Sequence, residues 1–270
     1  MRGYLVGLVG SGIGTSLSPA LHEREADVLG IRYLYRILDL DLLNATVGDL
    51  VAATNLAGYD GLNITHPVKQ HVLHHLDELS PDAEAVGAVN TVTFAGGRSV
   101  GHNTDLTGFS RALTTGLPDA PLDRIVLLGA GGAGAAIGHA LVSLGAKNLC
   151  VVDVDQARAD KLADRLGATA AGLDWIKGAD GLVNATPTGM VGHPGLPLPE
   201  ELLRPDLWVA DIVYRPLDTE LLRTARGIGC RVLDGGRMAV FQAADTFRII
   251  TGREPDPDRM LRHFDEIARR

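Results

Sequence analysis

The chain has 270 residues, of which 46% are hydrophobic and 33 are glycine, and its formal net charge is −8. This length suits one large domain or two ordinary ones with a sizeable core. The acidic balance without a basic cluster excludes a general nucleic-acid-binding protein, and the lack of an apolar run of about 18 residues excludes a membrane span. The two cysteines, Cys150 and Cys230, lie in apolar segments, which favours free thiols and a cytoplasmic location.

The first hundred residues alternate between strand-like and helix-like segments. The start, MRGYLVGLVGSGIG, predicts a strand and a turn rather than a signal peptide. Ser18 begins a helix with Pro19 in its first turn, where the missing N–H costs nothing. The expected strands are 4–10, 32–40 and 59–65, the expected helices are 18–30, 43–56 and 69–79, and a hairpin over 88–104 turns at Gly96-Gly97.

The remainder of the chain continues this alternation, starting with a helix at 105–117 and a loop at 117–123. Residues 124–155 form a complete strand–turn–helix–strand unit. Alternating strands and helices predict an α/β fold with parallel sheets and right-handed crossovers. Further strands are expected at 178–186, 207–214 and 230–235, and further helices at 156–167, 220–229, 238–252 and 255–270.

The stretch GAGGAG at 129–134 has the G-x-G-x-x-G spacing, directly follows the apolar strand VLL and opens an alanine-rich helix. In this context the motif binds a dinucleotide. Gly129 permits the tight turn, Gly131 lets the backbone approach the pyrophosphate, and Gly134 allows close helix packing. The N–H groups at the helix start would face the phosphates. An ordinary strand–helix turn is the alternative interpretation.

Asp153 ends the second strand of this unit, 19 residues after Gly134. An acidic residue at this place holds the ribose hydroxyls of NAD and repels the 2′-phosphate of NADP. The first basic residue that follows, Arg158, falls on the next helix, so the sequence favours NAD. Asp153 is alternatively a solvated strand-end residue. Asp155 competes with it for the ribose and is equally a candidate N-cap of the next helix.

Several segments together resemble the shikimate/quinate dehydrogenase family, and the resemblance extends over nearly the whole chain. It rests on their order and spacing more than on any single segment. The segments are TSLSPALH (15–22), NITHPVK (63–69), GAVNT (87–91), NTDLTGF (103–109), GAGGAG (129–134), NATPTGM (184–190), DIVYRPLDTELL (211–222) and the glutamine within AVFQAADTF (239–247).

The resemblance implies a two-domain α/β protein that transfers a hydride reversibly between a ring hydroxyl of shikimate or quinate and a nicotinamide. The implied parts are a substrate-binding catalytic domain at 1–104, a Rossmann NAD-binding domain at 105–236, and C-terminal helices at 237–270 that return to the first domain. The implied site residues are Lys69 and Asp105 as the catalytic pair, Ser16, Ser18, Thr65, Asn90, Tyr214 and Gln242 for substrate, and Gly129, Gly131, Gly132, Ala133, Gly134, Asp153, Asn184, Thr186, Gly235 and Met238 for cofactor.

The chemistry of alcohol oxidation suits the pair of Lys69 and Asp105 independently of the family resemblance. Oxidising a secondary alcohol requires removal of the hydroxyl proton as hydride leaves the carbon. A lysine beside the oxygen can take this proton, and its charge stabilises a developing alkoxide. A carboxylate would orient the ammonium group, and a cleft between two domains would supply the geometry. Lys69 is expected at the start of a helix, where the partial positive charge of the N-terminus opposes a cation unless a carboxylate lies opposite.

Each site residue also has an ordinary structural interpretation. Lys69 has the alternative of a surface lysine and Thr65 that of a simple strand threonine. Ser18 and Asp105 are candidate helix caps, and Ser16 and Asn90 are candidate turn residues. Tyr214 is alternatively a core tyrosine, whereas Gln242 lies on an apolar helix and needs a partner. His66 receives no catalytic role, and His71, His74 and His75 suggest a solvated helix face, so no metal site is expected.

One departure from the family pattern concerns the cofactor. NADP-dependent members carry Asn-Arg-Thr where this chain has Asp153, Val154 and Asp155, so the partner of the 2′-phosphate is missing here. NAD-using members are often linked to quinate use, which suggests a catabolic or dual-substrate enzyme. Ser18, in contrast, matches the serine of shikimate-specific members.

Several alternatives stay open from the sequence. The substrate is shikimate, quinate or an amino-substituted analogue. Arg237 and Phe241 depart from the usual family form without an assigned role. The competing functions are an NADP-dependent biosynthetic shikimate dehydrogenase and a non-catalytic metabolite or nucleotide sensor. The protein is expected to bind a small molecule as a monomer or homodimer, with no nucleic-acid or membrane partner.

Overall fold

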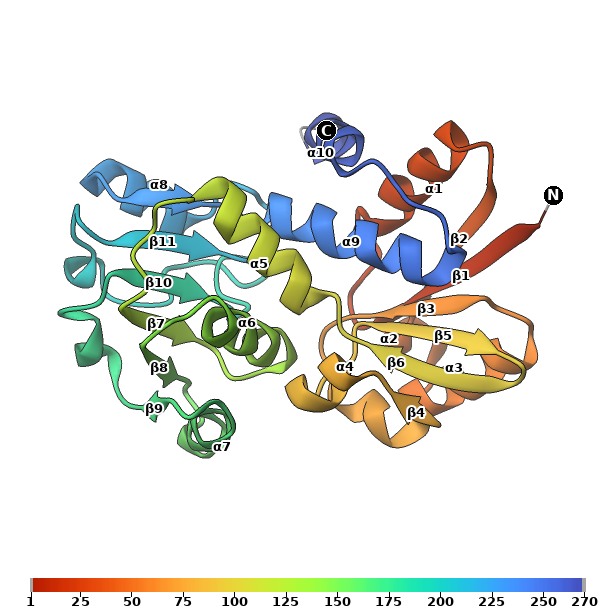
Figure 1. The fold of residues 1–270 in the computed structure, drawn as a ribbon, viewed down its shortest axis with the longest axis horizontal. Helices are drawn as coiled ribbons and strands as arrows, with labels where there is room; N and C mark the ends of the chain where they lie inside the picture. The colour runs from red at the N-terminus through yellow and green to blue at the C-terminus, as the bar shows by residue number, and fades with distance from the viewer. Residues whose placement is uncertain (1, 269–270) are drawn as a thin grey trace. The chain divides into compact units, whose positions relative to one another are not determined.

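The computed structural model describes residues 2–268, which form two compact units (Figure 1). Unit 1 contains the residues up to Asp105 and those from Val240 onward, and unit 2 spans Leu106–Ala239. Two helices, α5 (Asp105–Gly116) and α9 (Gly236–Thr251), carry the chain from one unit into the other. Each unit is built around its own six-stranded sheet.

Unit 1 contains a mixed sheet with the strand order β2-β1-β3-β5-β6-β4. The hairpin of β5 and β6 turns at Gly96 and Gly97, both with positive φ, as the sequence predicted. The strands are β1 (Gly3–Gly10), β2 (Arg32–Asp39), β3 (Gly61–Ile64), β4 (Glu78–Leu79), β5 (Thr91–Ala95) and β6 (Arg98–His102). The helices are α1 (Ser18–Val28), α2 (Leu40–Leu43), α3 (Val47–Leu56), the 3₁₀ turn η1 (His71–His75), α4 (Pro81–Val86) and α10 (Pro257–Ala268).

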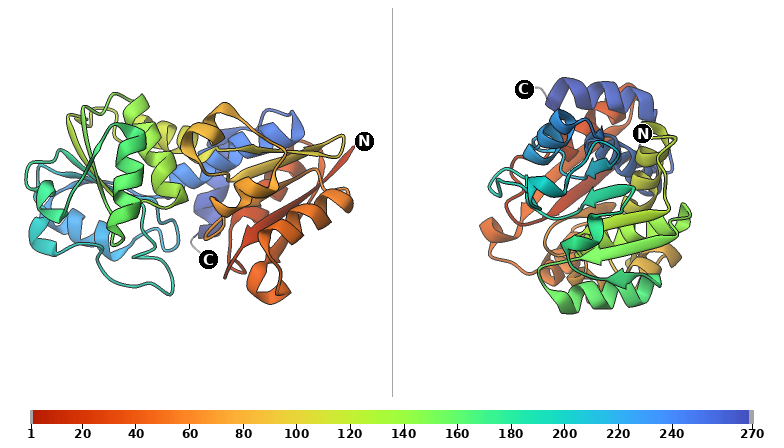
Figure 2. Two further views of the ribbon diagram at one scale, coloured as in Figure 1. Left: turned by 90° about the horizontal axis from the view of Figure 1, so that it is seen from below. Right: turned by 90° about the vertical axis from the view of Figure 1, so that its left-hand side faces the viewer.

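The sheet of unit 1 has an apolar core on each face because successive side chains of a strand point to opposite sides. Val6 and Leu8 of β1 pack with Phe247 of α9 in one core. Val9 of the same strand packs with Leu50 of α3 in the other. Figures 1 and 2 show helices stacked on both faces of this sheet. Helix α9, far away in sequence, therefore completes the core beside β1.

The prediction of a helix at 69–79 is wrong. Residues His71–His75 form only a 3₁₀ turn, and Glu78–Leu79 instead form β4, which pairs with β6. The carboxylate of Asp77 accepts hydrogen bonds from the backbone N and the hydroxyl of Ser99, at 2.7 and 2.8 Å. This long-range pairing overrides the local helix propensity.

The helix expected at 43–56 is present in a shorter form. Asn44 adopts a left-handed conformation with φ 47°, which ends the short helix α2. A capping box formed by Thr46 and Asp49 then starts α3. The structure also contains α4, which the sequence did not predict; Ser80 caps it and Pro81 occupies its first turn.

Unit 2 contains a fully parallel sheet with the strand order β12-β11-β10-β7-β8-β9. From β7 the chain adds β8 and then β9 toward one edge of the sheet, and from β10 it adds β11 and then β12 toward the other edge. A switch point therefore lies between β7 and β10. The strands are β7 (Arg124–Leu128), β8 (Asn148–Val152), β9 (Thr169–Ala170), β10 (Gly181–Asn184), β11 (Trp208–Asp211) and β12 (Arg231–Leu233). The helices are α6 (Gly132–Ser143), α7 (Gln156–Leu166), the 3₁₀ turns η2 (Leu173–Ile176) and η3 (Glu200–Leu202), and α8 (Glu220–Ile228).

Both faces of this sheet are also covered, as a doubly wound α/β fold requires. Val126 and Leu128 of β7 pack with Leu221 of α8. Leu127 lies on the opposite face, where a Cβ added to Gly138 of α6 would be 3.4 Å from its side chain. The α/β fold class, predicted from the alternating pattern, and the Rossmann-type sheet that the resemblance implied are thus confirmed. No helix in residues 2–268 is both long and apolar enough to cross a bilayer.

Candidate active site

An ion pair between Lys69 and Asp105 forms the centre of the candidate site in unit 1. Lys69 Nζ lies 2.6 Å from Asp105 Oδ2, and the two side chains are only 17% and 5% exposed. Burial of this degree distinguishes the pair from ordinary surface ion pairs, which are largely solvated. The interpretation of Lys69 as a solvated surface lysine is therefore wrong, although the Lys69 side chain is not fully enclosed.

Local backbone structure holds both partners in place. Lys69 follows β3 in a turn, and its carbonyl accepts a hydrogen bond from Val89 N at 2.8 Å. The prediction that Lys69 stands at the start of an α-helix is wrong. The expected repulsion between its charge and a helix dipole therefore does not arise. Asp105 is the first residue of α5, and its backbone N donates to Asn103 Oδ1 at 3.0 Å. The Asp105 carboxylate itself binds Lys69 and Asn90.

Asn90 connects this pair to the interior of unit 1. Its side-chain nitrogen donates to Asp105 Oδ1 at 3.0 Å and to Thr104 Oγ1 at 2.8 Å. Its side-chain oxygen accepts from Thr104 N at 2.9 Å. Asn90 is 2% exposed and lies at a bend just before β5. Its side chain also binds partners outside this bend, at Thr104 and Asp105.

A set of buried polar residues behind Asn90 was missed by the sequence analysis. Thr246 of α9 contacts Thr91 Oγ1 at 2.7 Å, and Asn63 accepts a hydrogen bond from the Tyr35 hydroxyl at 2.6 Å. The available signal was a polar side chain inside an otherwise apolar strand or helix, as in GLNI, where burial requires a partner. The members of this set are Tyr35, Asn63, Thr91, Thr104 and Thr246.

Ser16 and Ser18 lie together in the loop between β1 and α1. Ser18 N and Ser18 Oγ lie 3.3 and 3.2 Å from Ser16 Oγ, and both residues are half-buried. The interpretation of Ser18 as an N-cap is wrong, since Leu17 occupies the cap position and Ser18 is the first helical residue. Two adjacent hydroxyl groups at the start of a helix are well suited to a carboxylate ligand.

The loop that holds these serines is adjacent to Thr65. A Cβ added to Gly10 would lie 2.5 Å from Thr65 Cγ2 and 3.1 Å from the side chain of Ile13. Ser11 N also donates to the carbonyl of His66 at 3.1 Å. Gly10 is therefore required by the close approach of two loops, and this approach brings the serine loop next to the segment that precedes Lys69.

Gln242 lies on α9, four residues before Thr246, so the two side chains share a helix face. Because Thr246 points into the polar set behind Asn90, the half-buried Gln242 faces the same region one turn earlier. Residues 2–268 contain no group of three or more histidine, cysteine, aspartate or glutamate side chains arranged to hold a metal ion.

The glycine-rich turn of unit 2 has the geometry expected of a dinucleotide site. Gly129 has φ 98°, and a Cβ added to it would lie 2.9 Å from the backbone of Ala185. A Cβ on Gly134 would lie 1.9 Å from Gly129 O, whereas a Cβ on Gly131 meets nothing within 4 Å. The turn is thus closed toward the protein and open beside Gly131, at the uncapped N-terminus of α6. Contact of the loops after β7 and β10 also places this opening at the switch point of the sheet, where α/β folds bind ligands.

Asp153 lies against this turn. Its Oδ2 accepts from Ala130 N at 2.7 Å and its Oδ1 from Asp155 N at 2.9 Å, which fixes the carboxylate after the end of β8. Asp155 caps α7 through hydrogen bonds from Ala157 N and Arg158 N. Val154, between them, is fully exposed. The cap role proposed for Asp155 is therefore confirmed, and Asp153 is the aspartate that faces the turn.

The loop after β10 is organised by a buried polar network. Asn184 donates to Asp211 Oδ1 at 3.0 Å and to Thr188 O at 3.1 Å, and its Oδ1 accepts from Thr186 N and Thr186 Oγ1. Thr219 Oγ1 donates to Asp211 Oδ2 at 2.7 Å. Asn184 is fully buried, so its side chain shapes this loop through internal bonds. Asp211 and Thr219, which the sequence analysis did not assign, connect the loop to the N-terminus of α8.

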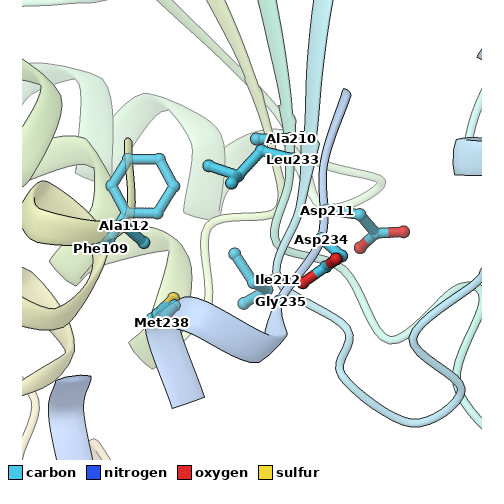
Figure 3. Close-up of a pocket in the computed structure, with 9 residues that line it drawn as sticks. All are labelled: Phe109, Ala112, Ala210, Asp211, Ile212, Leu233, Asp234, Gly235 and Met238. Atoms are coloured by element: carbon cyan, nitrogen blue, oxygen red, sulfur yellow. The ribbon is translucent and has the colours of Figure 1, made fainter. Parts of the chain in front are cut away.

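A small hollow next to this network contains two further residues predicted to bind cofactor, Gly235 and Met238 (Figure 3). The carboxylates of Asp211 and Asp234 lie on one side of it and the ring of Phe109 on the other. A Cβ on Gly235 would lie 2.3 Å from Ile212 O, so only glycine fits there. Tyr214 is half-buried in the loop after β11.

Burial raises the pKa of the Asp211 carboxyl group. Desolvation raises its pKa to about 6, despite hydrogen bonds from Thr219, Val213 and Asn184 that lower it. A carboxyl group whose folded-state pKa is raised stabilises the fold below its ordinary pKa, and this contribution is lost as the pH rises through about 6. Asp211 therefore destabilises unit 2 at neutral pH relative to acidic pH.

The variant Asp211→Asn, neutral at every pH, tests this expectation. Between about pH 4.5 and about pH 7.5, the free energy of unfolding of the wild type should fall by about 2 kcal/mol relative to that of the variant. Chemical denaturation at both pH values measures the difference. A difference that does not change with pH would contradict the raised pKa, and Asp174→Asn provides a control at an exposed aspartate.

The chain is similar over nearly its whole length to known dehydrogenases. Residues 8–92 match the family model described as the shikimate dehydrogenase substrate binding domain. A Streptomyces avermitilis protein named shikimate dehydrogenase (NADP(+)) is 61% identical, over 98% of this chain and 96% of its own. A Corynebacterium efficiens protein named quinate/shikimate dehydrogenase (NAD(+)) is 47% identical, over 96% of this chain and 97% of its own.

A solved structure described as quinate dehydrogenase from Corynebacterium glutamicum in complex with NAD superimposes with a TM-score of 0.91. It is 45% identical, over 98% of this chain and 99% of its own. Sequence identity of this degree over nearly the full length indicates membership of one family and not only a shared fold. The chain therefore belongs to the shikimate/quinate dehydrogenase family.

Proposed function

We propose that the protein is an NAD-dependent oxidoreductase that interconverts shikimate and 3-dehydroshikimate, quinate and 3-dehydroquinate, or both pairs. The observation that carries the proposal is the partly buried ion pair of Lys69 and Asp105, with Nζ and Oδ2 2.6 Å apart. An ammonium group held this way is suited to proton transfer at a ring hydroxyl. Family membership supports the reaction class, since the relatives compared above carry the names of such dehydrogenases.

In the reductive direction, the Lys69 ammonium donates a proton to the oxygen that forms at the ring carbon. In the oxidative direction, the same proton returns along the same path. Asp105 binds one side of Nζ and so directs the remaining N–H groups toward the substrate oxygen. The charge of Lys69 stabilises the alkoxide as it develops. The nicotinamide, when bound, accepts or supplies the hydride.

We assign substrate recognition to the side chains around this pair. Ser16 and Ser18 bind the ring carboxylate with their adjacent hydroxyls at the start of α1. Thr65, Asn90 and Gln242 bind the ring hydroxyls together with Asp105, and Tyr214 contributes from the loop after β11. The family resemblance supports this assignment, and the hydrogen bond from Asn90 orients the Asp105 carboxylate that would receive a ring hydroxyl.

For the cofactor, we assign the pyrophosphate to the opening beside Gly131, with the backbone of Gly132, Ala133 and Gly134 in the first turn of α6. Asp153 binds the adenine ribose, and the loop with Asn184 and Thr186 contacts the cofactor at the switch point. Gly235 and Met238 line the nicotinamide end. The fixed carboxylate of Asp153 favours NAD, since it would repel a 2′-phosphate.

A second candidate is an NADP-dependent shikimate dehydrogenase. The observation in its favour is that the Streptomyces relative, 61% identical, bears that name. The absence of a basic residue from Val151 to Ala157 opposes it. The two free, buried thiols, Cys150 and Cys230, support a reducing compartment such as the cytoplasm.

Initial-rate kinetics with shikimate and quinate, each with NAD and NADP, tests the proposal through nicotinamide absorbance. Turnover with NAD on either acid is expected, and the kcat/KM values would identify the preferred substrate. Equal or better turnover with NADP would replace the leading proposal with the second candidate. Binding of substrate or cofactor without turnover in any combination would instead indicate a sensor of the same fold.

A further inference from the structure

Thr246 lies at the centre of the polar set behind the candidate catalytic pair. It is fully buried on α9, and its hydroxyl oxygen lies 2.7 Å from Thr91 Oγ1 and 3.1 Å from Thr104 Oγ1. Asn63 Nδ2 is also near, at 3.4 Å. The other hydroxyl groups in contact with Thr246 come from residues at least 142 positions earlier in the chain. A polar group placed so deep in a core is costly unless its bonds are complete.

The orientation of the Asn90 amide follows from its contact with the backbone of Thr104. Thr104 N can only donate, so the atom of Asn90 that it contacts at 2.9 Å is the oxygen, Oδ1. Nδ2 of Asn90 therefore faces Asp105 Oδ1 and Thr104 Oγ1. Thr91 Oγ1 donates its proton to Asn90 Oδ1 at 3.1 Å. Each threonine hydroxyl has one proton, and Thr91 has now used its own.

The remaining two contacts can continue this direction. With the Thr91 proton on Asn90 Oδ1, Thr246 donates to Thr91 and accepts from Thr104. The four bonds form a closed ring. The Asn90 amide nitrogen donates to Thr104, Thr104 donates to Thr246, Thr246 donates to Thr91, and Thr91 donates to the Asn90 amide oxygen. Hydrogen bonds that all run in one direction polarise and strengthen one another.

This ring supports the orientation in which Asn90 binds the catalytic carboxylate. With the ring closed, an N–H of Asn90 binds Asp105 Oδ1, while Oδ2 of the same carboxylate binds Lys69. With the amide reversed, its oxygen would face the Asp105 carboxylate and its NH₂ would face the N–H of Thr104. Both contacts would be repulsive. These two contacts exclude the reversed amide, and the ring holds the Thr91 and Thr104 hydroxyls that bind the amide in its observed orientation.

We propose that Thr246 is a positioning residue for the reaction. Its hydroxyl closes the hydrogen-bonded ring, holds the Asn90 amide in one orientation and thereby fixes Asp105 relative to Lys69. The effect on turnover rests on the proposed dehydrogenase function, whereas the effect on Asn90 does not. The proposal gives α9 a second contribution to the site besides Gln242, one turn earlier.

Two substitutions at Thr246 and a control at Thr54 test the proposal. Thr246→Val keeps the shape and removes the hydroxyl, whereas Thr246→Ser keeps the hydroxyl. Thr54 is 4% exposed in unit 1 and donates only to the carbonyls of Leu50 and Val51 in its own helix. Thr54→Val therefore reproduces the loss of a buried hydroxyl away from the site. Thermal unfolding of all variants confirms that each one folds.

In the kinetic measurement, Thr246→Val should lower kcat at least about 10-fold with a change in KM below about 3-fold, because misplaced catalytic groups reduce the rate more than binding. Thr246→Ser should recover kcat to within about 3-fold of the wild type, and Thr54→Val should leave it unchanged. A Thr246→Val enzyme as fast as Thr54→Val, or a serine variant as slow as the valine variant, would overturn the proposal.

Nuclear magnetic resonance provides a measurement independent of turnover. The side-chain amide signals of Asn90, identified by their loss in Asn90→Ala, should shift and exchange faster with solvent in Thr246→Val but not in Thr246→Ser. If the wild type has no activity on any substrate, the proposed function fails. The Asn90 signals alone then test whether the Thr246 hydroxyl holds the Asn90 amide in place. Unchanged Asn90 signals in Thr246→Val would overturn the inference.

Discussion

Replacement of Lys69 by alanine is expected to lower kcat on the order of a thousandfold while substrate and NAD still bind. Loss of a positioned general acid–base commonly costs 10²–10⁴ in rate, that is, about 3–5 kcal/mol of transition-state stabilisation. The ammonium group that transfers the proton and stabilises the alkoxide would be absent, whereas Ser16, Ser18 and Gln242 would still contact the substrate. Steady-state kinetics gives the rate, and titration calorimetry gives the affinity.

Lys177 provides a matched control for this variant. Its Nζ lies 2.6 Å from Asp174 Oδ1, the same separation as in the catalytic pair, but the two side chains are 67% and 87% exposed. Lys177→Ala should therefore leave kcat unchanged. The double variant Lys69→Ala/Asp105→Ala should be scarcely slower than Lys69→Ala, since residues that act as a unit are not additive. A Lys69→Ala enzyme with near-normal kcat would disprove the proposed role.

The triple variant Asp153→Asn/Val154→Arg/Asp155→Thr is expected to shift the ratio of kcat/KM values from NAD toward NADP by about 100-fold or more. The first change removes a charge that repels the 2′-phosphate, and the second supplies a guanidinium that binds it. Val154 is fully exposed, so an arginine fits there without displacing any neighbour. Threonine at position 155 can still cap α7, as Asp155 does.

Two single variants separate the contributions within this segment. Asp155→Thr alone should leave the cofactor ratio unchanged if Asp153 binds the ribose. Asp153→Asn alone should weaken NAD use without creating efficient NADP use. Kinetics with both cofactors at fixed substrate measures each ratio. If Asp155→Thr instead produced the larger loss with NAD, the ribose assignment would move to Asp155.

The sequence by itself determined the features that depend on neighbouring residues. The glycine-rich turn is one example, because the tight turn at Gly129 and the close packing at Gly134 follow from the steric size of residues within a single strand–turn–helix unit. The hairpin at Gly96 and Gly97 is another, since its loop requires positive φ angles. The cap at Asp155 is equally local. The roles given to Lys69 and Asp105, 36 residues apart, depended on the family resemblance.

Only the tertiary structure decided the features that depend on distant partners. The segment 69–79 contains apolar residues at helical spacing, yet pairing of β4 with β6 and the bonds of Asp77 to Ser99 make it irregular. The raised pKa of Asp211 arises from burial. The contact of Thr246 with Thr104 spans 142 residues. Local patterns carry propensity and turn chemistry, whereas burial and long-range bonds arise only when distant segments pack together, so they decide which propensity prevails.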